Sequence, residues 1–208
     1  MRFADLDAVT LDAFGTLVGL RDPVPALREA LLERGFERDS RAIAEAFAAE
    51  GAYYRPRSLE GRDGESLARL RNECVAVFLE ELGAELAPED FVDTYIEALR
   101  FELLPGVPEA IRSLRRRGLA LAVVGNWDIA LPDPLAALGL GDVPVVTSAE
   151  VGAAKPDPAP FHRALAALRV PSVRTLHVGD DEVDELGARA AGMHFAWAPL
   201  TAVLEAAA

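Results

Sequence analysis

The chain has 208 residues, of which 51% are hydrophobic and 26% are charged, a balance typical of a soluble globular protein with one full core and room for a smaller second unit. This composition excludes the disordered and collagen-like classes. The net charge of −13 at pH 7 opposes binding to nucleic acid and to anionic membrane surfaces, so we expect neither as a partner.

The first expected strand covers residues 8–11 and ends at a carboxylate. This short apolar run leads directly into Asp12, and Gly15 follows within the next few residues. Apolar runs of this length, closed by a turn residue, are typical of buried strands. We therefore expect a strand whose carboxyl end delivers the Asp12 side chain to a loop.

Residues 23–100 show helical periodicity and no strand pattern. Apolar side chains recur three and four positions apart, as in Leu27, Leu31 and Leu32 or in Leu67, Leu70 and Cys74, which is the spacing of one face of a helix. A polar break lies at residues 56–64. We expect an insert of about four helices with this break in its middle.

After residue 104 helices and strands alternate to the end of the chain. The short strands lack the inward and outward alternation of a half-exposed sheet, which favours a parallel sheet covered on both faces. The expected helices are 108–117, 132–138, 158–168 and 184–191, and the expected strands are 119–124, 143–146, 174–178 and 194–197.

Several polar or glycine positions follow these strands directly. Asp12 follows the first, Gly125 and Asn126 follow the strand at 119–124, and Gly179 and Asp180 follow the strand at 174–178. In open α/β sheets, ligands gather at the carboxyl ends of the strands. We therefore expect these residues to meet at one edge of the sheet.

Lys155 is the single lysine in a chain with 20 arginines. An ammonium is a compact, strongly hydrated point charge, and it fits a tight anionic pocket that the planar guanidinium fork of arginine cannot enter. A sequence that uses arginine almost everywhere else has kept a lysine at the start of Lys-Pro-Asp-Pro. Lys155 is therefore our first candidate for a site residue.

The motifs around these residues, in their order and spacing, resemble those of the haloacid dehalogenase-like hydrolases. The resemblance spans the chain and implies an α/β fold with a Rossmann-like three-layer core around a parallel sheet, formed by residues 1–17 and 101–208, and a smaller all-helical cap domain at 18–100. The motifs that carry it are DAFGTL at 12–17, LPGV at 104–107, VGNWD at 124–128, SAEVG at 148–152, KPDP at 155–158, HVGDDEVD at 177–184 and GARAAG at 187–192.

The family is composed mainly of magnesium-dependent phosphatases, so the resemblance implies an aspartyl-phosphate mechanism. Asp12 would be the nucleophile, which divides one difficult displacement into two easier ones. Lys155 would neutralise the substrate's charge and keep Asp12 ionised. Mg²⁺ prefers oxygen ligands, and here they would be Asp12, the Phe14 carbonyl and Asp180, supported by Asp184 or else Asp181.

Two positions depart from the usual phosphatase pattern. Phe14 stands where the general acid aspartate is expected, a group that contributes about 10²–10⁴-fold to the rate. Gly125 stands where a serine or threonine usually bonds the phosphoryl group, and a lost hydrogen bond to a charged group costs roughly 1.5–3 kcal/mol unless Asn126 or backbone amides replace it. We expect Thr16, Gly125 and Trp127 to contact substrate, although Trp127 equally suits packing between core and cap.

These features leave three hypotheses open. The first is a magnesium-dependent phosphatase for a small phosphorylated metabolite, weakly active because of Phe14 and Gly125. The second is a 2-haloacid dehalogenase, which carries an aromatic residue at the position of Phe14 and releases halide without a proton. Arg38 or Arg41 could then contact the substrate carboxylate. Against this hypothesis, the dehalogenases have serine- and asparagine-containing loops where this chain has Asp180 and Asp181. The third is a catalytically silent binding protein.

Three further expectations follow from the sequence. Phosphonate cleavage is excluded, because its Schiff-base lysine would have to come from the cap and the chain has no second lysine. His177 is either an ordinary strand-end histidine or a group that orients a loop carboxylate. The lone Cys74, the lack of a leader pattern and the absence of any apolar run near the roughly 18 residues of a membrane span lead us to expect a cytoplasmic protein.

Overall fold

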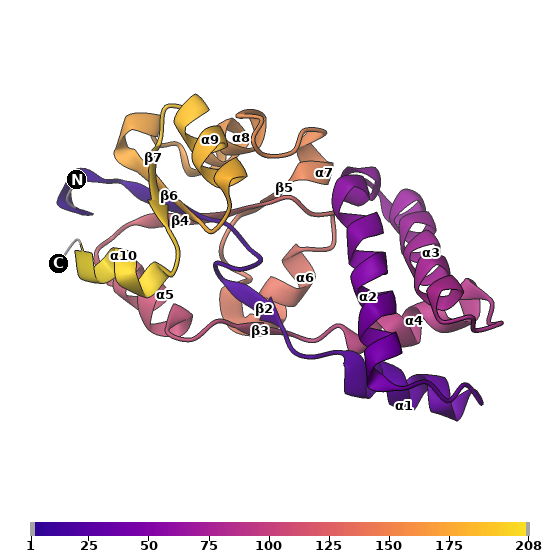
Figure 1. Cartoon of the computed structure of the whole chain (residues 1–208). Helices are drawn as coiled ribbons and strands as arrows, with labels where there is room; N and C mark the ends of the chain where they lie inside the picture. The colour runs from indigo at the N-terminus through magenta and orange to yellow at the C-terminus, as the bar shows by residue number, and fades with distance from the viewer. Residues whose placement is uncertain (1–2, 207–208) are drawn as a thin grey trace. The chain divides into compact units, whose positions relative to one another are not determined.

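The computed structural model describes residues 3–206. It divides the chain into two compact units (Figure 1). The core unit is built from both ends of the chain, up to Gly19 and from Glu102 onward, and the helical unit spans Leu20–Phe101.

The core unit is organised around a five-stranded sheet of order β5-β4-β1-β6-β7. All four strand pairings are parallel, which confirms the α/β fold expected from the sequence. The strands are β1 (Ala8–Leu11), β4 (Ala120–Gly125), β5 (Val145–Thr147), β6 (Thr175–Gly179) and β7 (His194–Trp197). The central position of β1 places its carboxyl end between the ends of β4 and β6.

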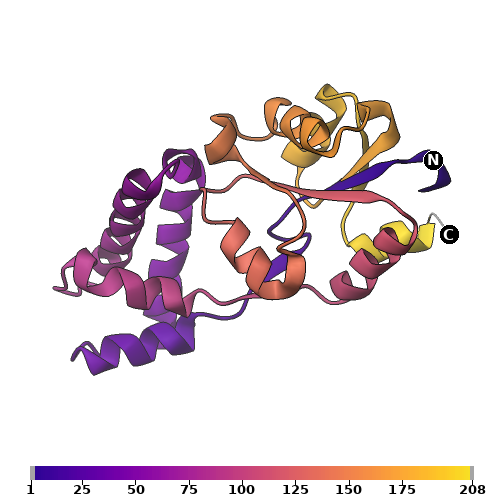
Figure 2. The same cartoon turned by 180° about the vertical axis from the view of Figure 1, so that it is seen from behind.

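Helices cover both faces of this sheet (Figures 1 and 2). Helices α8 and α9 lie on one face, where Phe161, Ala164 and Ala188 pack against Ala122 and Val124 of β4. Helices α5 and α10 lie on the opposite face. The helices of this unit are α5 (Val107–Arg116), α6 (Pro132–Leu135), α7 (Ser148–Val151), α8 (Ala159–Leu168), α9 (Glu182–Ala190) and α10 (Leu200–Ala206).

The structure differs from the sequence-based elements mainly where segments are short. The helix expected at 132–138 is α-helical only to Leu135 and continues as a wider turn over Ala136–Leu140, because Gly139 adopts a left-handed φ of 84°. The strand expected at 143–146 is found at Val145–Thr147. The elements that were not predicted include α7, α10 and the two short strands β2 (Val18–Leu20) and β3 (Phe101–Leu103).

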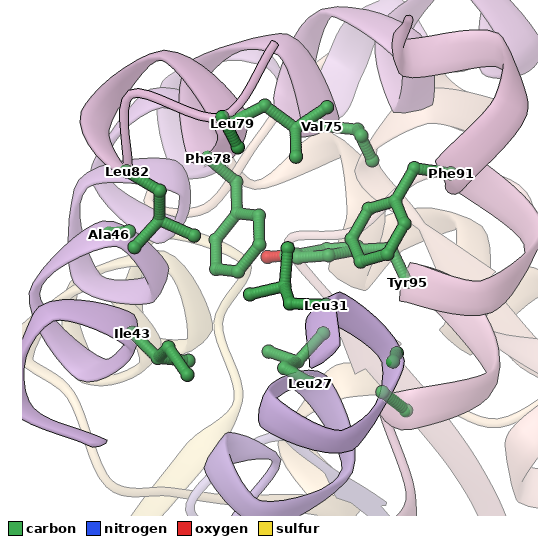
Figure 3. Close-up of a cluster of buried hydrophobic side chains, with 13 residues drawn as sticks. Leu27, Leu31, Ile43, Ala46, Val75, Phe78, Leu79, Leu82, Phe91 and Tyr95 are labelled. Carbon is green, nitrogen blue, oxygen red and sulfur yellow. The ribbon is translucent and has the colours of Figure 1, made fainter. Parts of the chain in front are cut away.

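The helical unit contains four α-helices within its described residues, with a 3₁₀ segment at Arg55–Glu60 in the polar break. Side chains of Asp39 and Asp63 accept hydrogen bonds from backbone amides and so cap α2 and α3. The stacked rings of Phe78 and Phe91 lie at the centre of its core, with centroids 6.3 Å apart (Figure 3). The helices are α1 (Val24–Glu33), α2 (Ser40–Tyr54), α3 (Gly64–Glu81) and α4 (Pro88–Ala98).

The chain passes between the two units through β2 and β3, which pair with each other in a separate two-stranded sheet. Among the helices of residues 3–206, none combines the length and the apolar character that a membrane crossing requires.

Candidate active site

The site lies at the carboxyl edge of the parallel sheet, where the predicted residues follow their strands. Asp12 follows β1 directly, and its backbone N–H donates to the carbonyl of Val178 at 2.9 Å, which extends the ladder by one residue. Asn126 follows β4 and Asp180 follows β6. Since neighbouring parallel strands end at the same edge, these three side chains come from adjacent positions.

Lys155 lies buried in the centre of this edge, with 5% of its surface exposed. Its ammonium contacts Asp12 Oδ1, Asp184 Oδ1 at 2.5 Å and the carbonyl of Val124 at 3.1 Å. An ammonium has three N–H donors, and these three acceptors satisfy all of them. The lysine is therefore held as a point charge between two carboxylates.

Asn126 holds the backbone of Lys155 in place. The Lys155 N–H donates to Asn126 Oδ1 at 2.7 Å, and Asn126 Nδ2 donates to the Lys155 carbonyl at 3.0 Å. The amide side chain is used in this contact both as a donor and as an acceptor. In this structure Asn126 thus positions the lysine.

Asp184 enters the site from the first turn of α9. Its Oδ1 contacts both Lys155 and His177 Nε2, the latter at 3.1 Å, and its Oδ2 accepts a hydrogen bond from the Asp181 N–H at 3.3 Å. A Cβ at Gly179 would lie 2.4 Å from the Asp184 carboxyl carbon, so only glycine allows this approach. The Asp181 side chain itself accepts from the Val183 N–H and caps the helix.

Asp180 lies at the exposed side of the site. Its Oδ1 accepts a hydrogen bond from the Thr16 hydroxyl at 3.2 Å. Gly15 has a left-handed φ of 86°, and a Cβ there would lie 2.1 Å from Asp180 Oδ2. Thr16, which we expected to contact substrate, contacts a candidate metal ligand in this structure.

The carboxylates carry unequal charge because their surroundings differ. Burial raises the pKa of Asp12 to about 7, with a further rise from Asp184 that Lys155 opposes. Burial also acts against the charged forms of Asp184 and Lys155. The contacts of Asp184 with His177 and Lys155 nevertheless lower its pKa, and the carboxylates of Asp12 and Asp184 raise the pKa of Lys155.

Asp12, Asp180 and Asp184 form a set of oxygen donors suited to a divalent cation. One carboxylate oxygen from each lies within 4.8 Å of the others. Hard cations such as Mg²⁺ take carboxylate oxygens as ligands, and three carboxylates gathered this closely repel one another unless cations compensate them. The residues present therefore fit such an ion. Of the two aspartates considered as the supporting ligand, Asp184 belongs to this cluster and Asp181 does not.

Phe14 and Trp127 place aromatic rings beside these polar groups. Phe14 is 50% exposed, and its ring centroid lies 6.4 Å from that of Trp127. Ser148 fixes the Trp127 backbone, since its hydroxyl accepts from the Trp127 N–H and donates to the Trp127 carbonyl. Ser148 was not among our candidates, although it is the first residue of the SAEVG motif.

Gly125 ends β4 in a tightly packed position. A Cβ there would lie 2.9 Å from Leu131 Cδ2 and 3.5 Å from the Cβ of Ala13. A serine or threonine at this position would thus require Leu131 to move.

The two arginines considered for a haloacid substrate have partners within the helical unit. Arg38 donates to the carbonyls of Leu82 and Gly83 at 2.8 and 2.9 Å. Arg41 forms an ion pair with Glu45 one turn along the same helix.

Comparison with known sequences agrees with these motifs. The sequence model of the haloacid dehalogenase-like hydrolases matches residues 6–192. The chain is 30% identical over 201 residues to "Haloacid dehalogenase-like hydrolase domain-containing protein 3" of Mus musculus, covering 89% of this chain and 79% of that protein. The alignment with its Bos taurus counterpart is 43% identical over 97 residues and spans 45% of this chain and 39% of that protein.

Relatives with named reactions fall into two groups. The chain is 38% identical over 128 residues to a phosphoserine phosphatase of Thermus thermophilus, which covers 57% of this chain and 50% of that enzyme. Among solved structures, a defluorinating L-2-haloacid dehalogenase matches with a TM-score of 0.72 at 22% identity, over 92% of this chain and 80% of that one. At this identity the likeness shows a shared fold.

Proposed function

Because the chain belongs to the haloacid dehalogenase-like hydrolases, we propose that it is a magnesium-dependent phosphatase for a small phosphorylated molecule, with Asp12 as the nucleophile. The observation that supports this proposal best is the grouping of Asp12, Asp180 and Asp184 within 4.8 Å of one another, with the ammonium of Lys155 between two of them. Positive charge held beside a carboxylate nucleophile, by a lysine or by a bound cation, stabilises the charge on a phosphoryl group during its transfer.

The reaction would proceed in two displacements at phosphorus. A carboxylate oxygen of Asp12 attacks phosphorus, and the ester P–O bond breaks as the leaving oxygen departs with its electron pair. Water then attacks the same phosphorus, and the bond to Asp12 breaks, which regenerates the carboxylate and releases inorganic phosphate. The proton that water loses and the proton that the leaving oxygen gains are exchanged with solvent.

The residues around Asp12 would prepare it for attack. Lys155 opposes the rise that burial gives to the pKa of Asp12, and its charge attracts the phosphoryl oxygens. Asn126 holds the backbone of Lys155, so the ammonium keeps its position beside the carboxylate of the nucleophile. A cation bound by Asp12, Asp180 and Asp184 supplies further charge neutralisation for the phosphoryl group.

The side chain of Phe14 cannot donate a proton to the leaving oxygen, and this limits the substrates. Without an acid at this position, the leaving group must depart as an anion or take its proton from water, which forgoes a contribution of about 10²–10⁴-fold. We therefore expect the enzyme to favour substrates with acidic leaving groups, such as acyl or aryl phosphates, and to act slowly on alkyl phosphates.

Phe14 also supports a second candidate, a 2-haloacid dehalogenase. A halide departs as a stable anion and needs no proton, so an aromatic side chain at this position costs such an enzyme nothing. Asp12 would then attack the carbon that bears the halogen, and water would hydrolyse the resulting ester. The acidic cluster favours the phosphatase, because a dehalogenation that releases an anion uses the Asp12 carboxylate but gains nothing from those of Asp180 and Asp184.

The deciding experiment is hydrolysis of p-nitrophenyl phosphate by the native protein and by Asp12→Asn, each with Mg²⁺ and with a chelator. The proposal expects phosphate release that requires Mg²⁺ and that is lost in the variant, which removes the nucleophile at nearly constant shape. Release that is equal in the variant would overturn the role of Asp12. Without release, a halide assay with 2-chloropropionate separates the dehalogenase from a binding protein.

A further inference from the structure

Thr10 and His177 form a buried polar pair inside an otherwise apolar layer. They are register partners on β1 and β6, and both are fully buried. Their neighbours in the same row across the sheet are Ala122 and Phe195, and the rings of Phe161 and His177 meet edge to face, with centroids 4.9 Å apart. Burying polar groups costs free energy unless each finds a partner, so the pair calls for an explanation.

Hydrogen bonds lead from this pair to the nucleophile. Thr10 Oγ1 lies 2.9 Å from His177 Nδ1, and His177 Nε2 lies 3.1 Å from Asp184 Oδ1. The same oxygen of Asp184 contacts the ammonium of Lys155, which contacts Asp12. Five side chains thus form one continuous path, and they come from β1 and the residue after it, from β6, from α9 and from the loop before α8.

The partners determine which nitrogen of His177 carries the proton. Asp184 is a carboxylate and accepts hydrogen bonds only, so Nε2 must be the donor. Nδ1 then accepts from the Thr10 hydroxyl.

From these contacts we propose that His177 is a positioning residue, whose Nε2–H donates to Asp184 while Thr10 satisfies its Nδ1, so that the ring fixes the Asp184 carboxylate toward Lys155 and the cation site. The ring has little freedom to do otherwise, because Phe161 packs on it and is itself held against Gly187, where a Cβ would lie 2.4 Å from the Phe161 ring. This role rests on the proposed phosphatase function for its kinetic consequence, but the tautomer is a property of the folded chain alone.

The first test is therefore spectroscopic and uses the full chain labelled with ¹⁵N-histidine. The sequence has three histidines, His162, His177 and His194, so the buried one is assigned by its loss in His177→Gln. A long-range ¹H–¹⁵N spectrum at neutral pH should show the Nε2–H tautomer for His177 in the native protein, and in Thr10→Val the Nδ1 resonance should shift because that nitrogen has lost its hydrogen-bond donor. A native Nδ1–H tautomer, or no change in Thr10→Val, would overturn the proposal.

The second test is kinetic and compares matched threonine variants. Thr175 lies on β6, is equally buried, and donates its hydroxyl to the Pro171 carbonyl, outside this path. Thr10→Val should raise the Mg²⁺ concentration needed for activity or lower kcat, whereas Thr175→Val should leave both unchanged once its fold is checked by circular dichroism. Equal effects of the two variants would indicate that Thr10 acts only through stability.

Histidine variants separate positioning from packing. Groups that orient metal ligands typically contribute about 10- to 100-fold to metal affinity or activity. We expect a loss of this size in His177→Leu and partial rescue in His177→Gln, whose amide N–H can reach toward Asp184. A folded His177→Leu protein with native kcat and native Mg²⁺ dependence would refute the role. If the native protein releases no phosphate, the phosphatase proposal fails while the spectra still decide the tautomer.

Discussion

Asn126 and Lys155 are joined by two hydrogen bonds, in which one side-chain amide pairs with both backbone groups of the lysine. The lysine therefore owes its place to a residue 29 positions earlier in the chain, at the end of β4. Lys155 is therefore fixed at its backbone by Asn126 as well as at its ammonium group, which faces Asp12.

We expect Asn126→Ala to lower kcat by about 10- to 100-fold, because a small displacement of Lys155 away from Asp12 has effects of this order. Stability should fall by about 1–3 kcal/mol, since two partly buried backbone groups lose their partners. Steady-state kinetics and denaturant unfolding measure the two effects. Asn72→Ala, which removes an asparagine hydrogen bond to the Ala68 carbonyl in the helical unit, should leave kcat unchanged. An Asn126→Ala enzyme with native kcat would contradict the positioning role.

Gly15→Ala should lower activity strongly by displacing Asp180. Its new Cβ would overlap Asp180 Oδ2 at 2.1 Å, in addition to the strain of a left-handed φ. Gly139→Ala is the matched control. Gly139 has a similar φ of 84°, but a Cβ there would meet nothing within 4 Å, so this variant adds only the backbone strain, roughly 1–2 kcal/mol, and no clash. Calorimetry should show both variants destabilised, while the requirement for Mg²⁺ should rise only in Gly15→Ala. A similar loss of activity in both would mean that strain, and not Asp180, is responsible.

Phe14→Asp should increase phosphatase activity, because it places a carboxyl group two residues after the nucleophile. The gain should reach about 10²-fold on alkyl phosphates, whose leaving oxygen needs a proton, and should be smaller on p-nitrophenyl phosphate. The ring is half exposed, so little packing is lost. Phe14→Asn is the matched control, with similar size and no acid. An equal gain in both variants would show that relief of crowding, and not proton donation, explains it.

Glu50→Gln should stabilise the protein at neutral pH. Glu50 is buried on α2, and burial raises its pKa above the ordinary 4.5. The folded protein therefore holds this proton more tightly than the unfolded chain does, so the stability that protonation provides is present below pH 4.5 and is lost as the pH rises through the folded pKa.

Thermal unfolding of native protein and Glu50→Gln from about pH 4 to about pH 8 tests this expectation. The two should unfold at similar temperatures at the acid end, and the variant should become the more stable one as the pH rises. A constant difference across this range would show that Glu50 does not titrate differently in the folded state.

The sheet and most of its polar edge could be predicted from sequence because each signal was local. Asp12 and Asn126 directly follow apolar runs, and Lys155 stands out because the chain contains one lysine. Buried strands with this pattern end at a common edge, so the positions of these residues followed from the fold class. The helical periodicity of residues 23–100 was equally direct.

Other features could not be predicted because they depend on distant partners. β2 and β3 each have three residues, too few for a periodic pattern, and they form only when segments far apart in the chain pair. The role of His177 depends on Thr10, a register partner 167 residues away, and nothing adjacent to His177 indicates it. The ion pair between Asp184 and Lys155 likewise needs the packed helix α9.

The central place of β1 in the sheet has a consequence for folding during synthesis. β1 leaves the ribosome before its neighbours β4 and β6, which follow only after the whole helical unit. That unit, with its own core of short-range contacts, is complete well before β6 has been made. Since sheets with distant pairings form slowly, we infer that the helical unit folds first. β1 then stays unpaired, with its apolar residues accessible to chaperones, until it pairs first with β4 and then with β6.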